Sequence, residues 1–331
     1  MTRTSACQVE RTAKPRPHRN ATCVPGDRLL ARLFTLSALT LCLVCGAPRS
    51  LADEEPVATG PEVKAFRLGA LEISVLRDGG LAIPNDGSVF GLNAKPANVA
   101  QVLRNTGAPT DKVRLDIDVL LVRMKGHLAL IDSGYGPAGH GVLTKSLASA
   151  GASPGEITDV LITHSHTDHV GGLVDAQGNS AFPQATIRMS ANEWSFMQSR
   201  ADTRAIATAV KAQVKTFEPG RALLPGIAPR ALRGHTPGHV GYEITSQGQR
   251  LMDIGDAAHS SIVSLAKPDW TIAWDSDQGQ GVKTRRQELQ HLASTHELMF
   301  APHFPFPGVG KIVPAGDGFR FQPDVPTGKQ E

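Results

Sequence analysis

The spacing of apolar residues predicts a chain of short strands and helices from residue 63 onward. Alternation of apolar and polar residues favours a half-buried strand, and recurrence about every three to four positions favours a helix with one buried face. In the N-terminal half, this pattern predicts strands at 63–68, 71–76, 116–124 and 127–131, helices at 96–104 and 143–150, and a loop rich in Gly, Pro and Asn at 79–95.

The C-terminal half continues the same mixture of strands and helices. The helix expected at 203–215 has a clear apolar face, formed by Ile206, Val210 and Val214. A further helix is expected to start at 170–173, where two glycines stand together. The other elements predicted here are strands at 159–163, 186–189, 231–233, 240–245, 251–254, 297–300, 311–314 and 318–321, and helices at 191–199 and 282–294.

The candidate chemistry is concentrated at residues 161–173, which read L-I-T-H-S-H-T-D-H-V-G-G-L. Imidazole nitrogens suit zinc and iron, and a carboxylate adds an oxygen ligand. Residues two apart in an extended segment point the same way, so His164 and His166 can bind one ion from the same side. Asp168 and His169 follow where the chain turns, and they can face a second ion. The alternative interpretation is a polar loop that happens to carry histidines.

Four further motifs accompany this segment: I-D-S-G at 131–134, G-H-T-P-G-H at 234–239, G-D-A-A-H at 255–259 and A-P-H-F-P-F-P-G at 301–308. Together with H-x-H-x-D-H, they resemble the signature of the metallo-β-lactamase superfamily over nearly all of the chain after residue 60. The resemblance implies an α/β fold in which two mixed β-sheets pack face to face with helices outside, an αββα sandwich. Metal ligands would lie on loops at one edge of it.

The resemblance also implies roles for individual residues. One ion would be bound by His164, His166 and His235, the other by Asp168, His169 and His303, and Asp256 would bridge the two. Two divalent ions, with zinc favoured, would leave room for water or hydroxide between them. Asp168 and Asp256 are the candidate catalytic proton carriers. Asp132, His239 and His259 would support the ligands, although Asp132 could instead cap a turn and His259 could lie on the surface.

Aromatic residues close to these motifs are candidates for a substrate pocket. Trp194 and Phe196 lie in the segment that follows the histidine motif, and burial in the core is the alternative for both. Trp274 lies in an aromatic-rich segment at 269–277, and Phe304 directly follows His303. Apolar side chains at these positions would suit a hydrophobic substrate.

Within the superfamily, segments 255–259, 270–277 and 303–308 most resemble the methyl parathion hydrolase family. This resemblance implies a dinuclear hydrolase in which a metal-bridging hydroxide attacks an ester, lactone or phosphotriester. N-acyl homoserine lactonases are an alternative. They use a tyrosine from the segment after the histidine motif, whereas the tyrosines of this chain are Tyr135 and Tyr242.

Three other classes are alternatives. Zinc β-lactamases are exported too, but they lack an aspartate in the role given to Asp256. A persulfide dioxygenase shares H-x-H-x-D-H but uses one iron, so the complete second ligand set argues against it. A catalytically silent scaffold would be expected to have lost ligands, and all seven are present in this sequence.

The first 52 residues have the pattern of a secretory signal peptide. Arg28 and Arg32 precede an uncharged apolar run at 33–47, and Ser50-Leu51-Ala52 offers a cleavage site. The run is shorter than the roughly 18 residues that a membrane span needs, so an uncleaved anchor is the less favoured alternative. We therefore expect a leader at 1–52 and an exported domain at 53–331, periplasmic or secreted, with no stable membrane span after cleavage.

Composition changes sharply at this boundary. All four cysteines lie in the leader, so the exported domain would carry no thiolate ligand or nucleophile. Residues 1–52 hold eight Lys and Arg but two Asp and Glu, and without them the net charge changes from +3 to about −3. No nucleic-acid partner is expected, because such partners need a basic patch. The expected partner is a small hydrophobic ester or lactone, and a homodimer is left open.

Overall fold

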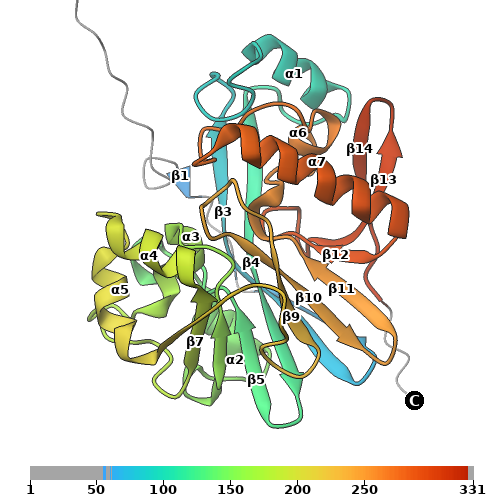
Figure 1. Ribbon diagram of the computed structural model, residues 1–331. Coiled ribbons are helices and arrows are strands. Elements are labelled where there is room, and N and C mark those ends of the chain that lie inside the picture. The colour runs from blue at the N-terminus through green and yellow to red at the C-terminus, as the bar shows by residue number, and fades with distance from the viewer. Residues whose placement is uncertain (1–54, 57–59, 61, 327–331) are drawn as a thin grey trace, which may run out of the picture. The chain divides into compact units, whose positions relative to one another are not determined.

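Two mixed β-sheets form the centre of the domain in the computed structural model, which describes residues 55–56, 60 and 62–326 (Figure 1). Within these ranges the first sheet has eight strands and the second has six. In spatial order the first contains β1 (Glu55–Pro56), β3 (Leu71–Pro84), β4 (Lys112–Met124), β5 (His127–Ile131), β6 (Asp159–Leu161), β7 (Thr186–Ser190) and β8 (Val214–Phe217), and β2 (Val63–Leu68) pairs with β3. The second contains β14 (Gly318–Pro323), β13 (Val309–Ala315), β12 (Leu298–Phe300), β11 (Gln249–Asp253), β10 (Val240–Ser246) and β9 (Ile227–Ala231).

Helices cover the outer faces of the sheets. On the first sheet, α2 (Leu143–Ser149), α4 (Ala191–Ser199) and α5 (Arg204–Val210) bury apolar side chains in one cluster with strand residues. On the second sheet, α6 (Val263–Ala266) and α7 (Gln278–Thr295) do the same. Figure 1 shows α4 and α5 on one side of the sheets and α7 on the other. Helix α1 (Pro96–Arg104) packs with the ends of β3 and β4. This arrangement confirms the predicted αββα sandwich.

Strand β4 shows why the first sheet is buried on both faces. Leu120 and Val122 point into the core between the two sheets, whereas Val119 and Leu121 point into the core beneath the helices. Successive side chains of a strand alternate between faces, so a continuous apolar run fills two cores at once. The core between the sheets also contains Tyr242 of β10, whose ring is fully buried.

Several predicted boundaries are wrong, for identifiable reasons. The loop expected from residue 79 begins later, because β3 continues through a bulge at Arg77/Gly79 to Pro84 and pairs with β4 throughout. The helix expected at 203–215 ends at Val210, and Val214 instead starts β8 beside β7. The strand expected at 231–233 lies earlier, as β9. The helix expected from residue 170 begins at Thr167, as α3 (Thr167–Val170), and α6 was not predicted.

The strand order brings the ends of separate strands together at one edge. Strand β5 runs parallel to β6, and β11 runs parallel to β12. The loops that follow parallel neighbours leave the sheet on the same side. Asp132 follows β5, the histidine motif follows β6, Asp256 follows β11 and His303 follows β12. The sheets therefore bring these sequence-distant loops to the same place.

The described part of the chain contains no helix that is long and apolar enough to cross a membrane. The predicted leader, residues 1–52, lies outside the described residues. Its presence and removal therefore stay predictions.

Tyr242 links the second sheet to the histidine motif across the core. Its hydroxyl donates a hydrogen bond of 2.8 Å to the backbone carbonyl of Ile162, at the end of β6. Tyr242→Phe should lower the free energy of unfolding by about 1–2 kcal/mol, because a buried carbonyl loses its partner. Urea denaturation of the metal-free chain measures this change. An unchanged free energy of unfolding would show that the hydrogen bond contributes no net stability.

Candidate metal centre

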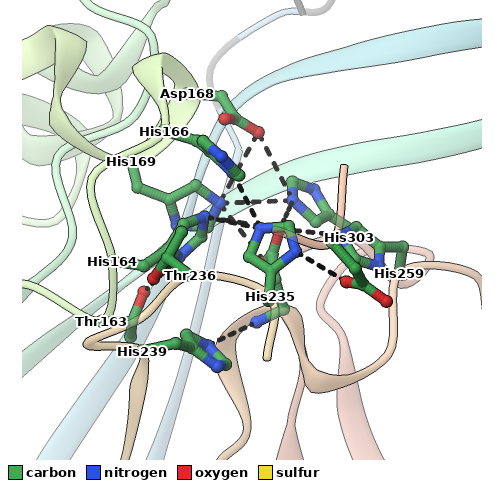
Figure 2. Close-up of polar contacts among 12 residues, drawn as sticks. Thr163, His164, His166, Asp168, His169, His235, Thr236, His239, His259 and His303 are labelled. Atoms are coloured by element: carbon green, nitrogen blue, oxygen red, sulfur yellow. Dashed lines mark hydrogen bonds and ion pairs between the residues drawn. The ribbon is translucent and has the colours of Figure 1, made fainter. Parts of the chain in front are cut away.

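Loops from both sheets converge on a buried cluster of imidazoles and carboxylates (Figure 2). Every member has a relative exposure of 7% or less. The structure brings together all seven residues that the sequence pattern singled out as ligands: His164, His166, Asp168, His169, His235, Asp256 and His303.

The three histidines assigned to the first ion lie in mutual contact. His166 Nδ1 is 2.8 Å from His235 Nε2, which is in turn 3.1 Å from His164 Nε2. Two neutral imidazoles can share one proton between facing nitrogens, but three facing nitrogens cannot all be paired in this way. A cation bound by all three would satisfy them together.

The second group lies next to the first. His169 Nε2 is 3.3 Å from His303 Nε2, and Asp168 Oδ2 lies 3.6 Å from the former and 3.4 Å from the latter. Asp256 stands between the two groups: its Oδ1 is 3.3 Å from His169 Nε2, and its Oδ2 is 3.4 Å from His235 Nε2. A single carboxylate thus faces members of both groups.

Most of these histidines are held by their second ring nitrogen. His169 Nδ1 lies 2.8 Å from a carboxylate oxygen of Asp132, and His303 Nδ1 lies 2.8 Å from the backbone carbonyl of Asp116. His164 Nδ1 lies 3.1 Å from the hydroxyl of Thr163. Such contacts fix the ring orientation and direct Nε2 into the cluster.

Asp132 occupies a strained position that its contacts stabilise. Its φ is +62°, a left-handed conformation that is uncommon for residues other than glycine. Its carboxylate accepts hydrogen bonds from the Thr163 amide and hydroxyl, at 2.8 and 2.7 Å, besides facing His169. The residue therefore ties the end of β5 to the histidine motif, in the place expected for a supporting carboxylate.

Glu193 of α4 is a second buried carboxylate at the site, and the sequence pattern gave no sign of it. It accepts hydrogen bonds from the amide and hydroxyl of Ser165, at 2.7 and 2.6 Å. It also accepts from the Thr236 hydroxyl at 2.6 Å and the Gly238 amide at 3.1 Å. One side chain therefore joins the loop that carries His164 and His166 to the loop that carries His235. Burial raises the pKa of Glu193, and the four donors oppose this shift.

His235 has its own supporting carboxylate, Asp275, at 3.1 Å from Nδ1. Arg285 of α7 donates to Asp275 at 2.9 Å and to the backbone carbonyls of Ala257, Pro268 and Trp270. Arg285 is 1% exposed, and a buried charge is costly unless it is paired. The carboxylate of Asp275 and the three carbonyls compensate the charge of its guanidinium. The aromatic-rich segment 269–277 was expected near the site, but the role of Asp275 depends on His235, which lies 40 residues earlier in the sequence.

The two other predicted supporting histidines differ from each other. His239 is fully paired, because its Nδ1 lies 2.7 Å from the Leu232 carbonyl and its Nε2 accepts from the Asp256 amide at 3.1 Å. His259 is 0% exposed, and neither of its ring nitrogens has a hydrogen-bond partner among the described residues. Its Nε2 lies 3.2 Å from Asp256 Oδ2.

The four aromatic residues proposed for a substrate pocket do not lie together. The indole ring of Trp274 is 5.3 Å from the ring of His259, beside the cluster. Phe196 lies on α4 with the Arg200 guanidinium 5.3 Å from its ring, and Trp194 packs against the core beneath the helices. Phe304 is fully buried against Phe321 in the core of the second sheet.

Electrostatics divides the histidines into two kinds. Burial lowers the pKa values of His164, His166 and His235 well below their usual range, so these rings are neutral. For His169 burial acts in the same direction, but the nearby carboxylates of Asp256, Asp168 and Asp132 raise its pKa well above the usual range. Imidazole binds metal in its neutral form, which favours the first three as ligands without loss of a proton.

The chemistry of the donors fits metal ions. Both carboxylate oxygens of Asp168 and Oδ1 of Asp256 are buried without a hydrogen-bond partner in the described ranges. Buried carboxylates without partners are costly, and a bound cation would remove that cost. Three groups of three residues in this cluster have donor atoms within 4.8 Å of one another, and a fourth group adds His259 to His235 and Asp256. Imidazole with carboxylate is a donor set that suits zinc and iron.

This chain belongs to the metallo-beta-lactamase superfamily, because residues 114–302 match the model of that family. The match includes six of the seven residues of the cluster, and the seventh, His303, directly follows it.

Known proteins give the same assignment. Metallo-beta-lactamase domain-containing protein 1 of Xenopus laevis is 30% identical over 135 residues, which cover 41% of this chain and 49% of that protein. The chain therefore matches about half the length of this relative. The structure of AidC, a dizinc quorum-quenching lactonase in complex with its product N-hexanoyl-L-homoserine, is 29% identical with a TM-score of 0.77 and covers 81% of this chain and 99% of AidC. The hydrolase AbOPH is 26% identical with a TM-score of 0.75, covering 82% of this chain and all of AbOPH.

Glu193 provides a test of how the two ligand loops are held. Glu193→Gln places an amide NH₂ against groups that also donate, so at least one buried N–H or O–H loses its acceptor. The free energy of unfolding of the metal-free chain should fall by about 2–4 kcal/mol in urea denaturation. The exposed Glu218→Gln is the matched control, with a change within about 0.5 kcal/mol. Equal stabilities of the two variants would contradict the role of Glu193.

Proposed function

We propose that this protein is a dinuclear metal-dependent hydrolase that cleaves an ester, lactone or phosphotriester bond, as methyl parathion hydrolase does. The observation that carries the proposal is the convergence of seven buried donors, in which both carboxylate oxygens of Asp168 and Oδ1 of Asp256 lack hydrogen-bond partners among the described residues. A structural metal site would need four donors, whereas these seven suffice for two ions with positions left open for a substrate.

Each ion would be held by side chains that already lie together. The first would be bound by His164, His166 and His235, and the second by Asp168, His169 and His303. Asp256, which faces both groups, would be shared between them. Divalent ions at these positions, with zinc favoured, supply Lewis acidity towards a carbonyl or phosphoryl oxygen and make water more acidic.

The remaining chemistry belongs to the protein's own side chains. Asp168 and Asp256 have buried oxygens available to accept the proton that an attacking water releases, and they are the proposed catalytic residues. Asp132 and Asp275 hold His169 and His235 in orientation through their second nitrogens. The buried setting excludes bulk water, which strengthens each of these interactions.

A lactone is one substrate class that a specific observation favours. AidC, a lactonase, matches this chain over 99% of its own length at 29% identity. The expected tyrosine of N-acyl homoserine lactonases is nevertheless missing from the segment after the histidine motif. Tyr242 cannot take its place, because its hydroxyl is buried and bonded to the Ile162 carbonyl. A lactone is therefore among the proposed substrates, without being assigned to the quorum signals.

The redox alternative, a persulfide dioxygenase with one iron, is less well supported. It would use the histidine motif with one ion, and it would leave Asp168, His303 and their neighbours without a metal. The unpartnered oxygens of Asp168 favour a second ion instead. A β-lactamase remains a further hydrolase alternative, disfavoured by the position of Asp256 between the groups.

Metal content and turnover, measured together on the full chain, test the proposal. We expect about two metal ions per chain, and hydrolysis of at least one of a p-nitrophenyl ester, a γ-lactone, an acyl homoserine lactone and methyl parathion. Asp256→Ala should lower kcat/KM at least about 100-fold, because even the outer partners of metal ligands are worth about 10–100-fold. The exposed Asp317→Ala is the control and should retain activity. One iron per chain with no hydrolysis would overturn the proposal and favour the dioxygenase.

We further propose that the enzyme is exported, on the basis of the signal-peptide pattern at 1–52. Expression of the full chain in a Gram-negative host should yield a periplasmic or secreted product that starts near Asp53, as found by fractionation and N-terminal sequencing. Replacing four leucines of the apolar run 33–47 with Gln should keep the product in the cytoplasm at full length. An uncleaved wild-type chain in the membrane fraction would instead support an anchor.

A further inference from the structure

His259 is a buried histidine that neither the hydrogen-bond network nor the proposed ligand set uses. It follows a short 3₁₀ turn at Gly255–Ala257 that carries Asp256. Its side chain is 0% exposed, and both ring nitrogens lack a hydrogen-bond partner within the described ranges. A neutral imidazole carries one donor and one acceptor, so burying both unpaired is unfavourable unless something else binds them.

The other histidines of the site show what a purely supporting role looks like. His239 uses both of its nitrogens, one on the Leu232 carbonyl and one on the Asp256 amide. His259 differs because its ring is held by stacking. The centroid of its ring lies 5.9 Å from that of His303, with an angle of 5° between the two ring planes. The ring of Trp274 is a second aromatic neighbour, with a centroid distance of 5.3 Å. The ring of His259 therefore has aromatic neighbours, whereas its nitrogens have no hydrogen-bond partner among the described residues.

His259 Nε2 lies next to the carboxylate of Asp256, which the two ligand groups share. It lies 3.2 Å from Asp256 Oδ2, without the angles of a hydrogen bond, and His235 Nε2 lies 3.4 Å from the same oxygen. Two ligands of one tetrahedral ion, with bond lengths of about 2.1 Å, stand about 3.4 Å apart. The spacing of these atoms is thus that of ligands on a common ion.

We propose that His259 is an eighth metal-binding residue, which acts with His235 and Asp256. These three side chains form a group of their own, with donor atoms within 4.8 Å of one another, and all three are buried. The inference rests on the proposed dinuclear site and extends its ligand set. It predicts that the ion next to His235 and Asp256 has an additional imidazole available, so that it can change coordination number as a substrate arrives and a product leaves.

Metal binding to the full chain tests this role without relying on activity. The metal-free wild type, His259→Ala and His259→Gln are titrated with Zn²⁺ against a chelator of known affinity. We expect one of the two dissociation constants to rise about 10–100-fold in both variants. His291→Ala, which removes a half-buried histidine of α7 outside the cluster, is the matched control and should bind as the wild type does. Thermal denaturation before titration confirms that each variant is folded.

Spectroscopy of the loaded protein supplies a second readout. The visible absorption of Co²⁺ reports coordination number, so its bands should shift in His259→Gln, and X-ray absorption of the zinc form should show a smaller imidazole contribution. Unchanged dissociation constants and an unchanged Co²⁺ spectrum in His259→Gln would overturn the inference. Failure of the proposed hydrolase would look different, because the wild type would then bind fewer than two ions or turn over no substrate.

Discussion

The structure depends on placing five imidazoles and two carboxylates in one buried space. Such groups are costly to bury, and their charges and lone pairs need partners. The protein meets this constraint with an outer set of carboxylates: Asp132 holds His169, Asp275 holds His235, and Glu193 joins two ligand loops. The inner set then faces inward, and its unpartnered oxygens mark where cations fit. The sandwich provides the rigid frame on which this arrangement rests.

The ligands and the residues that support them come from many separate elements of the fold. Ligands come from loops after β6, β9, β11 and β12, and supporting groups come from α4 and the segment before α7. The buried guanidinium of Arg285 extends the network, because it fixes Asp275 and three backbone carbonyls at once. A change at α4 or α7 is therefore expected to reach the site although neither helix carries a ligand. This coupling follows from hydrogen bonds between groups that have no water to replace a lost partner.

Family membership and activity rest on different observations. The match at 114–302 shows the superfamily, and the two sheets show its fold. The choice among ester, lactone and phosphotriester depends on the residues that line the substrate pocket. The aromatic side chains that were expected there occupy different positions. Trp274 lies beside His259, whereas Phe304 is buried in the core of the second sheet. The metal chemistry is thus better defined by the structure than the substrate is, because the donors are fixed by buried contacts.

The sequence by itself determined the types of the ligands and most of the strands and helices, but not α6 or β8. Apolar alternation located strands such as β2, β5 and β7 closely, and H-x-H-x-D-H identified a metal-binding segment through its local spacing. Tertiary structure alone decided where β3 ends, since its pairing with β4 outweighs the glycines at 79–80. It also revealed the roles of Glu193, Asp275 and Arg285, whose hydrogen-bond partners lie 10 to 45 residues away in the sequence. Local sequence spacing does not predict such roles, because the partners of a buried charged side chain come from segments that only the fold brings close to it.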